Sequence, residues 1–144
     1  MSVLAAIRPD DWNLPLFVHI LGAMVLVGSL GLVLVALAGR DIRLAYRSLL
    51  LGVVPGWIVM RGAAEWIADK EGVNDVDPEP DWVGIGYSIA DPMLLLIIIA
   101  TVCAGIAARR QRTGGALRGT ALALTGIMLA AAVVAIWAMS TKPT

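Results

Sequence analysis

Apolar residues dominate four long stretches of this chain, and polar residues gather in the segments between them. The stretches are Leu14–Ala38, Leu44–Ile67, Val83–Ala108 and Ala116–Met139. Each reaches the ~20 residues that an α-helix needs to cross a hydrocarbon core ~30 Å thick. The pattern predicts an all-α fold, a four-helix transmembrane bundle that forms a single domain over residues 1–144.

The composition is typical of a protein surrounded by lipid. Hydrophobic residues make up 59% and charged residues 15% of the chain, and the mean hydropathy is +0.84. A soluble domain of this length could not cover so much apolar surface. The net charge is zero, which excludes the basic surface of a nucleic-acid-binding protein. We expect the lipid bilayer, a small-molecule ligand, and a second copy or another membrane subunit as partners.

Arginines cluster in the first and third connections and predict the orientation of the chain. They are Arg40, Arg43, Arg47, Arg109, Arg110, Arg112 and Arg118. Most acidic residues lie on the opposite side, including the loop 68–81, so the positive-inside rule places both termini outside the cytoplasm. The tryptophans at the predicted outer helix ends fit an aromatic belt: Trp12, Trp66, Trp82 and Trp137. We therefore expect a multi-pass protein of a bacterial plasma membrane with extracytoplasmic termini.

Ionisable residues also interrupt the apolar stretches, in the half of the bilayer predicted to be outside. They are His19, Arg61, Glu65 and Asp91. Such groups cost a few kcal/mol each in lipid unless they are paired or hydrated, so they should turn inward and meet. The topology therefore predicts a polar pocket in the outer leaflet, with His19 close to Arg61 or Asp91.

Arg61 and Glu65 are four residues apart, and this spacing favours an ion pair on one helix face. The pair is either a structural clamp or part of a ligand site, because a guanidinium also binds carboxylate or phosphate. Trp57, one turn before Arg61, and Tyr87 would form apolar walls of such a site.

Prolines and small residues indicate how the helices bend and pack. Asp91 precedes Pro92, which predicts that the third helix breaks there and that Asp91 caps a helix over Pro92–Ala108. The Pro55-Gly56 pair predicts a kink in the second helix. Close helix packing is expected at a set of small residues: Gly22, Gly28, Gly31, Gly119, Ala123, Gly126 and Ala130.

His19 is the only histidine, and its place inside a helix leaves three roles open. It is a hydrogen-bonded structural residue, a proton relay, or an axial ligand to haem. Bis-histidine haem is excluded within one protomer. A copper site that combines His19 with methionine thioethers is a further alternative.

Two short patches carry a family resemblance. The first helix has His19 within Leu16–Ala23 and Gly28 after it, and the chain closes with Lys142-Pro143. These features resemble small bacterial membrane proteins that include uncharacterised integral membrane families, the CopD copper-resistance domain and the HemJ type of protoporphyrinogen oxidase. The resemblance implies a four-helix layout and carries over His19 alone, as a haem or metal contact. The further histidine and basic positions of HemJ-type proteins have no match in this chain.

These observations favour a binding protein over an enzyme. No catalytic triad, phosphate loop or nucleophile with its base is visible. The expected function is binding of a small ligand or cofactor, haem or quinone-like, at His19, Trp57, Arg61, Glu65, Tyr87 and Asp91. The alternatives are a structural or accessory subunit of a membrane complex, and translocation of copper or protons by an oligomer.

Overall fold

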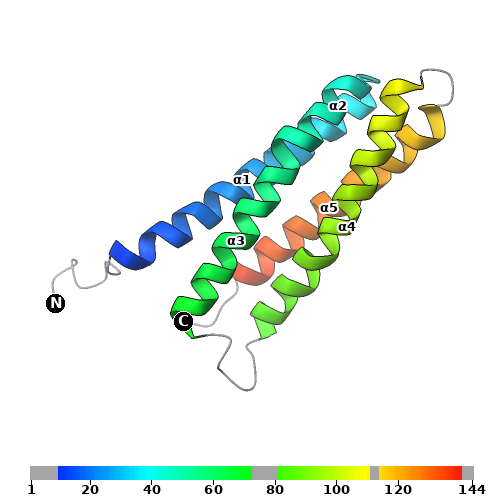
Figure 1. Ribbon diagram of the computed structural model, residues 1–144. Helices are drawn as coiled ribbons and strands as arrows, with labels where there is room; N and C mark the ends of the chain where they lie inside the picture. The colour runs from blue at the N-terminus through cyan, green and yellow to red at the C-terminus, as the bar shows by residue number, and fades with distance from the viewer. Residues whose placement is uncertain (1–9, 73–80, 111–113, 141–144) are drawn as a thin grey trace.

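The computed structural model describes residues 10–72, 81–110 and 114–140, and these form long helices joined by short turns. The helices are α1 (Asp10–Ala38), α2 (Ile42–Ser48), α3 (Val54–Glu71), α4 (Asp81–Arg109) and α5 (Gly114–Ser140). A π-helical turn at Leu49–Val53 joins α2 to α3, so that α2, this turn and α3 make one continuous rod. The described chain is thus an up-and-down bundle of four rods (Figure 1). This confirms the predicted four-helix bundle.

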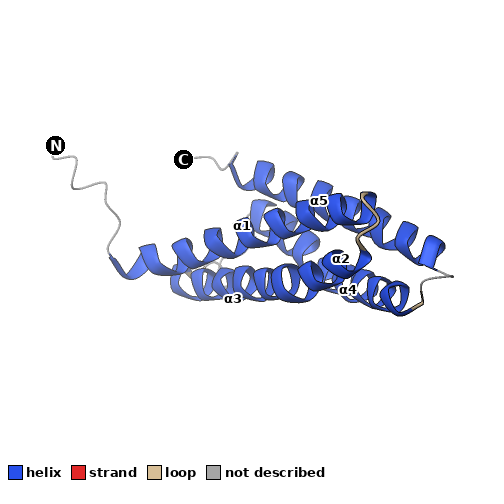
Figure 2. Cartoon of the chain, turned by 90° about the horizontal axis from the view of Figure 1, so that it is seen from above, coloured by secondary structure: helices blue, strands red, loops and turns tan. Residues whose placement is uncertain are grey.

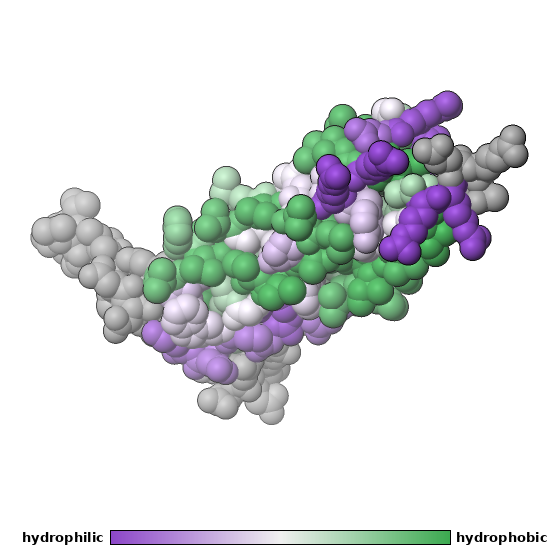
Figure 3. Space-filling model, turned by 45° about the horizontal axis from the view of Figure 1, so that its top comes forward, coloured by the Kyte–Doolittle hydropathy of each residue, from purple (hydrophilic) through white to green (hydrophobic). Residues whose placement is uncertain are grey.

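Each rod is long and apolar enough to cross a membrane. By length and composition the spans are Leu14–Ala38, Ile42–Lys70, Val83–Arg109 and Gly115–Ser140. Most of the surface in Figure 3 is an apolar band, and hydrophilic side chains project at its ends. Large aliphatic side chains on the outside of a bundle are normal where the solvent is lipid. The described helices therefore indicate a multi-pass membrane protein.

The two ends of the bundle differ in chemistry, and we name them accordingly. The arginine end holds the turn between α1 and α2 and the facing ends of α4 and α5 (Figure 1). The termini end holds Asp10, where α1 begins, and Ser140, where α5 ends. The predicted acidic loop lies at this end of the chain, and its residues 73–80 fall outside the described residues.

The rods pack as two hairpins, α1 with α3 and α4 with α5, as both Figure 1 and Figure 2 show. The helices α1 and α3 of the first hairpin approach each other closely, because glycines on each helix face the backbone of the other. A Cβ atom at Gly22 would lie 2.6 Å from the Met60 nitrogen, and one at Gly56 would lie 2.8 Å from the Leu26 nitrogen. Gly52 takes the Ser29 side chain in the same way. This is the small-residue packing that membrane helices use in place of a hydrophobic driving force.

The fully apolar core lies mainly in the half nearer the arginine end. Its largest buried side chains come from all four rods: Leu26, Leu30, Val33, Leu37, Leu49, Val53, Ile97 and Met128. Toward the termini end the buried apolar residues are mostly small, such as Ala63, Ala68 and Ala138. The direct contact between α3 and α4 is slight there. Polar side chains therefore have room between these two helices.

Two predictions about helix shape and packing are corrected. The break at Asp91-Pro92 is wrong, because α4 runs without interruption from Asp81 to Arg109 with Pro92 inside it. Pro92 removes only the bond to the Ser88 carbonyl, and a bundle tolerates that loss. In the second rod a π-helical turn at Leu49–Val53 ends two residues before Pro55, and the kink predicted at Pro55-Gly56 stays a prediction.

The second correction concerns the small residues. Of the predicted glycine contacts only Gly22 packs closely. A Cβ at Gly28, Gly31, Gly119 or Gly126 would meet nothing within 4 Å in the described chain, and Ala123 and Ala130 are exposed. The close contact uses Gly52 and Gly56 instead, because these are the small residues that face α1.

Candidate functional site

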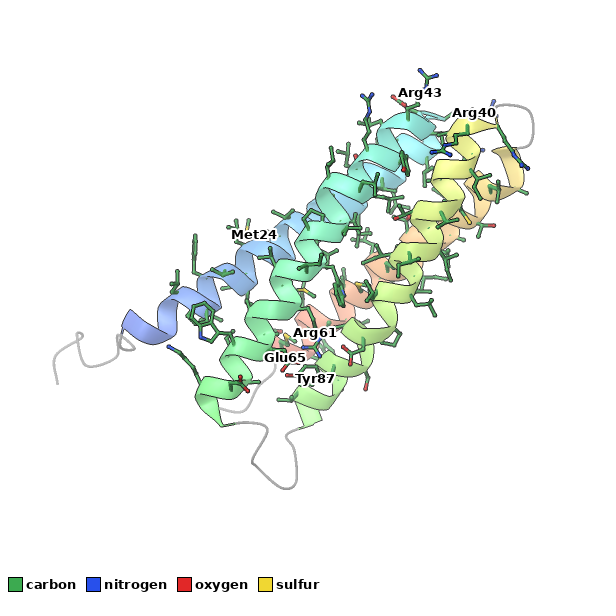
Figure 4. All side chains as sticks on the ribbon, in the orientation of Figure 1. Met24, Arg40, Arg43, Arg61, Glu65 and Tyr87 are labelled. Atoms are coloured by element: carbon green, nitrogen blue, oxygen red, sulfur yellow. The ribbon has the colours of Figure 1, made fainter. Side chains whose placement is uncertain are left out.

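Arg61 is the centre of a charged cluster between α3 and α4. Its Nε donates a hydrogen bond to Asp91 Oδ1 at 3.0 Å, and its Nη1 pairs with Glu65, one turn further along α3. The guanidinium carbon lies 4.5 Å from the centre of the Tyr87 ring, in cation–π contact. Figure 4 shows Arg61, Glu65 and Tyr87 gathered between the two helices. The predicted Arg61–Glu65 pair is confirmed, and Asp91 is a second partner.

The depth of this cluster follows from helix geometry. Arg61 lies about ten residues, or roughly 15 Å, before the end of α3 at Glu71, and Asp91 lies equally far from the start of α4 at Asp81. The 29-residue α4 is roughly 43 Å long, so its ends reach beyond a ~30 Å hydrocarbon core by about 7 Å each. By the same measure Arg61 and Asp91 lie about 8 Å inside the hydrocarbon core, and Glu65, six residues before the end of α3, lies about 2 Å inside it, near its boundary.

The exposure of the three side chains is uneven. Only 19% of the Arg61 side chain is exposed, whereas 48% of Glu65 and 59% of Asp91 are exposed. One positive and two negative groups leave the cluster with one excess negative charge when all are ionised. In hydrocarbon an exposed carboxylate at this depth is costly unless water, a ligand or a partner covers it. The exposed sides of Glu65 and Asp91 are thus the part of the cluster that the other described residues leave uncovered.

A second polar link joins α3 to α4 beside the cluster. Trp57 Nε1 donates a hydrogen bond of 2.9 Å to the carbonyl oxygen of Ala90, next to Asp91 in the chain. Trp57 is one turn before Arg61 on α3, and its side chain packs against the aliphatic core. It therefore lies between the charged cluster and that core. Indole N–H groups seek such an acceptor when buried. Trp57 therefore fixes α3 against α4 beside Arg61, and its role as a wall of a ligand site stays a prediction.

His19 reaches α3 from the other hairpin helix. Its Nδ1 lies 2.9 Å from the carbonyl oxygen of Met60, the residue before Arg61. Since a carbonyl can only accept, Nδ1 donates in this bond, and in the neutral imidazole Nε2 is then the acceptor. His19 therefore reaches the level of Arg61 through the α3 backbone, and it bonds to the Met60 carbonyl rather than to the guanidinium or to Asp91.

The described residues offer little to a metal ion. Among them no three His, Cys, Asp or Glu side chains gather as a coordination group. Met93 is buried in the core, and Met24 is 68% exposed and points away from the bundle (Figure 4). The predicted alternative, a copper site of His19 with the thioethers of Met24, Met60, Met93 or Met139, stays a prediction.

Two of the partners in this site were not predicted. The Ala90 and Met60 carbonyls accept from Trp57 and His19, and a sequence gives no signal for a backbone acceptor in the middle of a helix. The hydrogen bond between Asp91 and Arg61 is indicated in the sequence by one feature, which is that the two residues lie at the same depth in their helices. That depth follows from helix lengths alone.

Comparisons with protein-family models, with curated proteins and with solved structures give no match. The likeness to CopD-like and HemJ-type proteins therefore stays a prediction. Functional inference rests on the geometry of the site.

Proposed function

We propose that this protein binds a small ligand, without catalysing a reaction, at the cluster of Arg61, Glu65 and Asp91. The observation that carries the proposal is the exposure of two carboxylates at membrane depth around one largely covered guanidinium. A purely structural clamp would balance its charges and cover them. An excess carboxylate beside Tyr87 and Trp57 instead provides a polar contact between aromatic walls, which is how small-molecule sites are built.

The charge of the cluster narrows the class of ligand. Two edges of the Arg61 guanidinium already hold Glu65 and Asp91, so an anion would have to displace one of them. Ionised carboxylates only accept hydrogen bonds, so the excess negative charge favours a cationic ligand, or a neutral one with hydroxyl donors such as the quinol form of a quinone-like molecule. It disfavours the propionates of haem. His19 Nε2 would serve as a further acceptor on the α1 side.

The site belongs to the outer leaflet in this proposal. The arginine end carries Arg40, Arg43, Arg109 and Arg110, and the positive-inside rule places such an end in the cytoplasm of a bacterial cell. The exposed Trp66 and Trp137 at the termini end support the same orientation. The ligand would then reach Glu65 and Asp91 from the extracytoplasmic side.

Purification in a mild detergent tests the proposal. We expect organic extraction and mass spectrometry of the native protein to recover one non-phospholipid molecule in near-stoichiometric amount. The Glu65→Gln/Asp91→Asn variant should retain at least tenfold less of it, whereas Gly126→Ala should retain it fully, because Gly126 has no close neighbour in the described chain. A folded native protein without any such molecule, or equal retention by both variants, would contradict ligand binding here. A Soret band in the absorption spectrum would select haem instead.

An accessory role in a membrane complex is the second candidate. One observation favours it: Gly119, Ala123, Gly126 and Ala130 leave an open face of small residues on α5. Membrane helices associate through such faces. Stoichiometric recovery of another subunit, cross-linked through a cysteine at position 123, would favour this role over ligand binding.

A further inference from the structure

The arginine end concentrates positive charge, of which only the Asp41 carboxylate offsets a part among the described residues. Five exposed arginines lie there: Arg40, Arg43, Arg47, Arg109 and Arg110. Their guanidinium groups make no hydrogen bond or ion pair with any described residue. Among the described residues the one acid at this end is Asp41, and its carboxylate accepts a hydrogen bond from the Leu44 nitrogen at 3.0 Å, where it caps α2. A sixth described arginine, Arg118, donates to the Leu37 carbonyl at 2.8 Å.

Arg40 stands at a backbone position that normally belongs to glycine. Helix α1 ends with bonds from the Asp41 nitrogen to the Ala36 carbonyl (2.8 Å) and from the Arg40 nitrogen to the Leu37 carbonyl (3.2 Å). This is the Schellman ending, whose left-handed residue here is Arg40, with φ 64°. Helix α3 ends on Gly72 in the same conformation, as expected. An arginine that holds a strained backbone position indicates a use for its side chain.

The register of α2 against α4 brings further arginines to the same level. The Tyr46 ring packs on Gly105, where a Cβ would lie 3.0 Å from the ring. The two helices run in opposite directions, so one turn toward the arginine end from this contact stand Arg43 on α2 and Arg109 on α4. Arg40, before Arg43 in the chain, and Arg110, after Arg109, lie further toward the arginine end. Figure 4 shows Arg40 and Arg43 together at this end.

We propose that this arginine cluster, Arg40, Arg43, Arg109 and Arg110, binds the phosphate of an anionic phospholipid headgroup. Guanidinium groups bind phosphate through paired N–H donors, and a phosphate would relieve the repulsion among them. The cluster lies where the apolar spans end, at Arg109 and beside Ile42, which is the level of headgroups. Exposed Leu44, Val102 and Ile106 lie toward the membrane centre and would contact the acyl chains. This inference does not depend on the Arg61 cluster.

Thermal unfolding of the purified protein in a neutral detergent, with added lipid, tests the proposal. Dioleoylphosphatidylglycerol should raise the Tm, and dioleoylphosphatidylcholine should not. Arg40→Gly should have a higher Tm than the native protein without lipid, because glycine relieves the left-handed backbone. The same variant should bind phosphatidylglycerol about fivefold more weakly, since one juxtamembrane arginine contributes about that factor.

Two further variants separate charge from backbone. Arg109→Gln lies in helical backbone and should weaken phosphatidylglycerol binding to a similar degree with no gain in lipid-free Tm, and Arg40→Lys should keep most of the binding. Equal protection by phosphatidylcholine, unchanged phosphatidylglycerol affinity in both Arg40→Gly and Arg109→Gln, or a lower lipid-free Tm of Arg40→Gly would overturn the proposal. Protection by sodium phosphate as strong as that by the lipid would also overturn it, because the ligand would then be a soluble anion.

Discussion

At the scale of single residues, the chemistry of this protein depends on how Arg61 is shared. Its side chain is the best covered of the three charged groups, and it contacts both carboxylates and the Tyr87 ring. A guanidinium suits this role because its planar fork offers several donors and its face stacks on an aromatic ring. Arg61 therefore links α3 to α4 where the apolar contact between them is slight.

Removal of Arg61 should expose the dependence of both carboxylates on it. Arg61→Ala strands Glu65 and Asp91 at membrane depth, and we expect a loss of about 1–3 kcal/mol in the free energy of unfolding, less than for a fully buried pair. The double change Arg61→Ala/Asp91→Asn should recover part of that loss, because one stranded charge is gone. Unfolding in mixed micelles measures both. Strictly additive losses would mean that Arg61 and Asp91 act through separate partners.

The sequence predicts this residue chemistry unevenly. The spacing of Arg61 and Glu65 gives their pair directly, because residues four apart share a helix face. Asp91 has the same depth as Arg61, yet the Pro92 that follows favours a capping role that the continuous α4 does not contain. The reason is energetic. A helix break within lipid would leave several backbone N–H and C=O groups without a hydrogen bond, whereas Pro92 inside a continuous helix removes only one bond.

At the scale of helices, the contact between α1 and α3 sets the position of His19. Gly22 and Gly56 allow the two backbones to approach, and one turn from Gly22 His19 meets the Met60 carbonyl. From sequence, glycines mark every face on which helices are able to approach. Which of these faces finds a neighbour depends on tertiary register, so Gly22 was predicted correctly while Gly119 and Gly126 were not.

A matched pair of substitutions tests this contact. Ala favours helix over Gly by up to ~1 kcal/mol at any interior position, so Gly126→Ala should be neutral or slightly stabilising. Gly22→Ala should instead lose about 1–3 kcal/mol in the free energy of unfolding, because its Cβ would lie 2.6 Å from the Met60 nitrogen. Chemical unfolding in detergent gives both values. Equal effects of the two changes would show that α1 and α3 are not in close contact.

At the scale of the whole molecule, the bundle has an apolar half and a polar half. The number of rods could be predicted from sequence, since each apolar stretch exceeds the ~20 residues of a membrane span. The placement of the large core residues toward the arginine end could not, because large aliphatic residues occur along every stretch and only packing selects which of them are covered. That asymmetry leaves the termini half to the Arg61 cluster.

The central claim is that Glu65 and Asp91 face a water- or ligand-filled site open to the outside rather than lipid. Accessibility of single cysteines tests it most directly, in a Cys103→Ala background on intact cells, with a membrane-impermeant thiol reagent. Ile98→Cys is the matched lipid-facing control on α4, since Ile98 is 51% exposed and deeper in the span. Arg110→Cys reports the opposite side.

We expect the Asp91→Cys variant to react from outside, Ile98→Cys to stay unmodified, and Arg110→Cys to react only after permeabilisation. An Asp91→Cys side chain that is as inert as Ile98→Cys, even in permeabilised cells, would show that the cluster faces lipid or is sealed. That result would contradict an open ligand site at this depth.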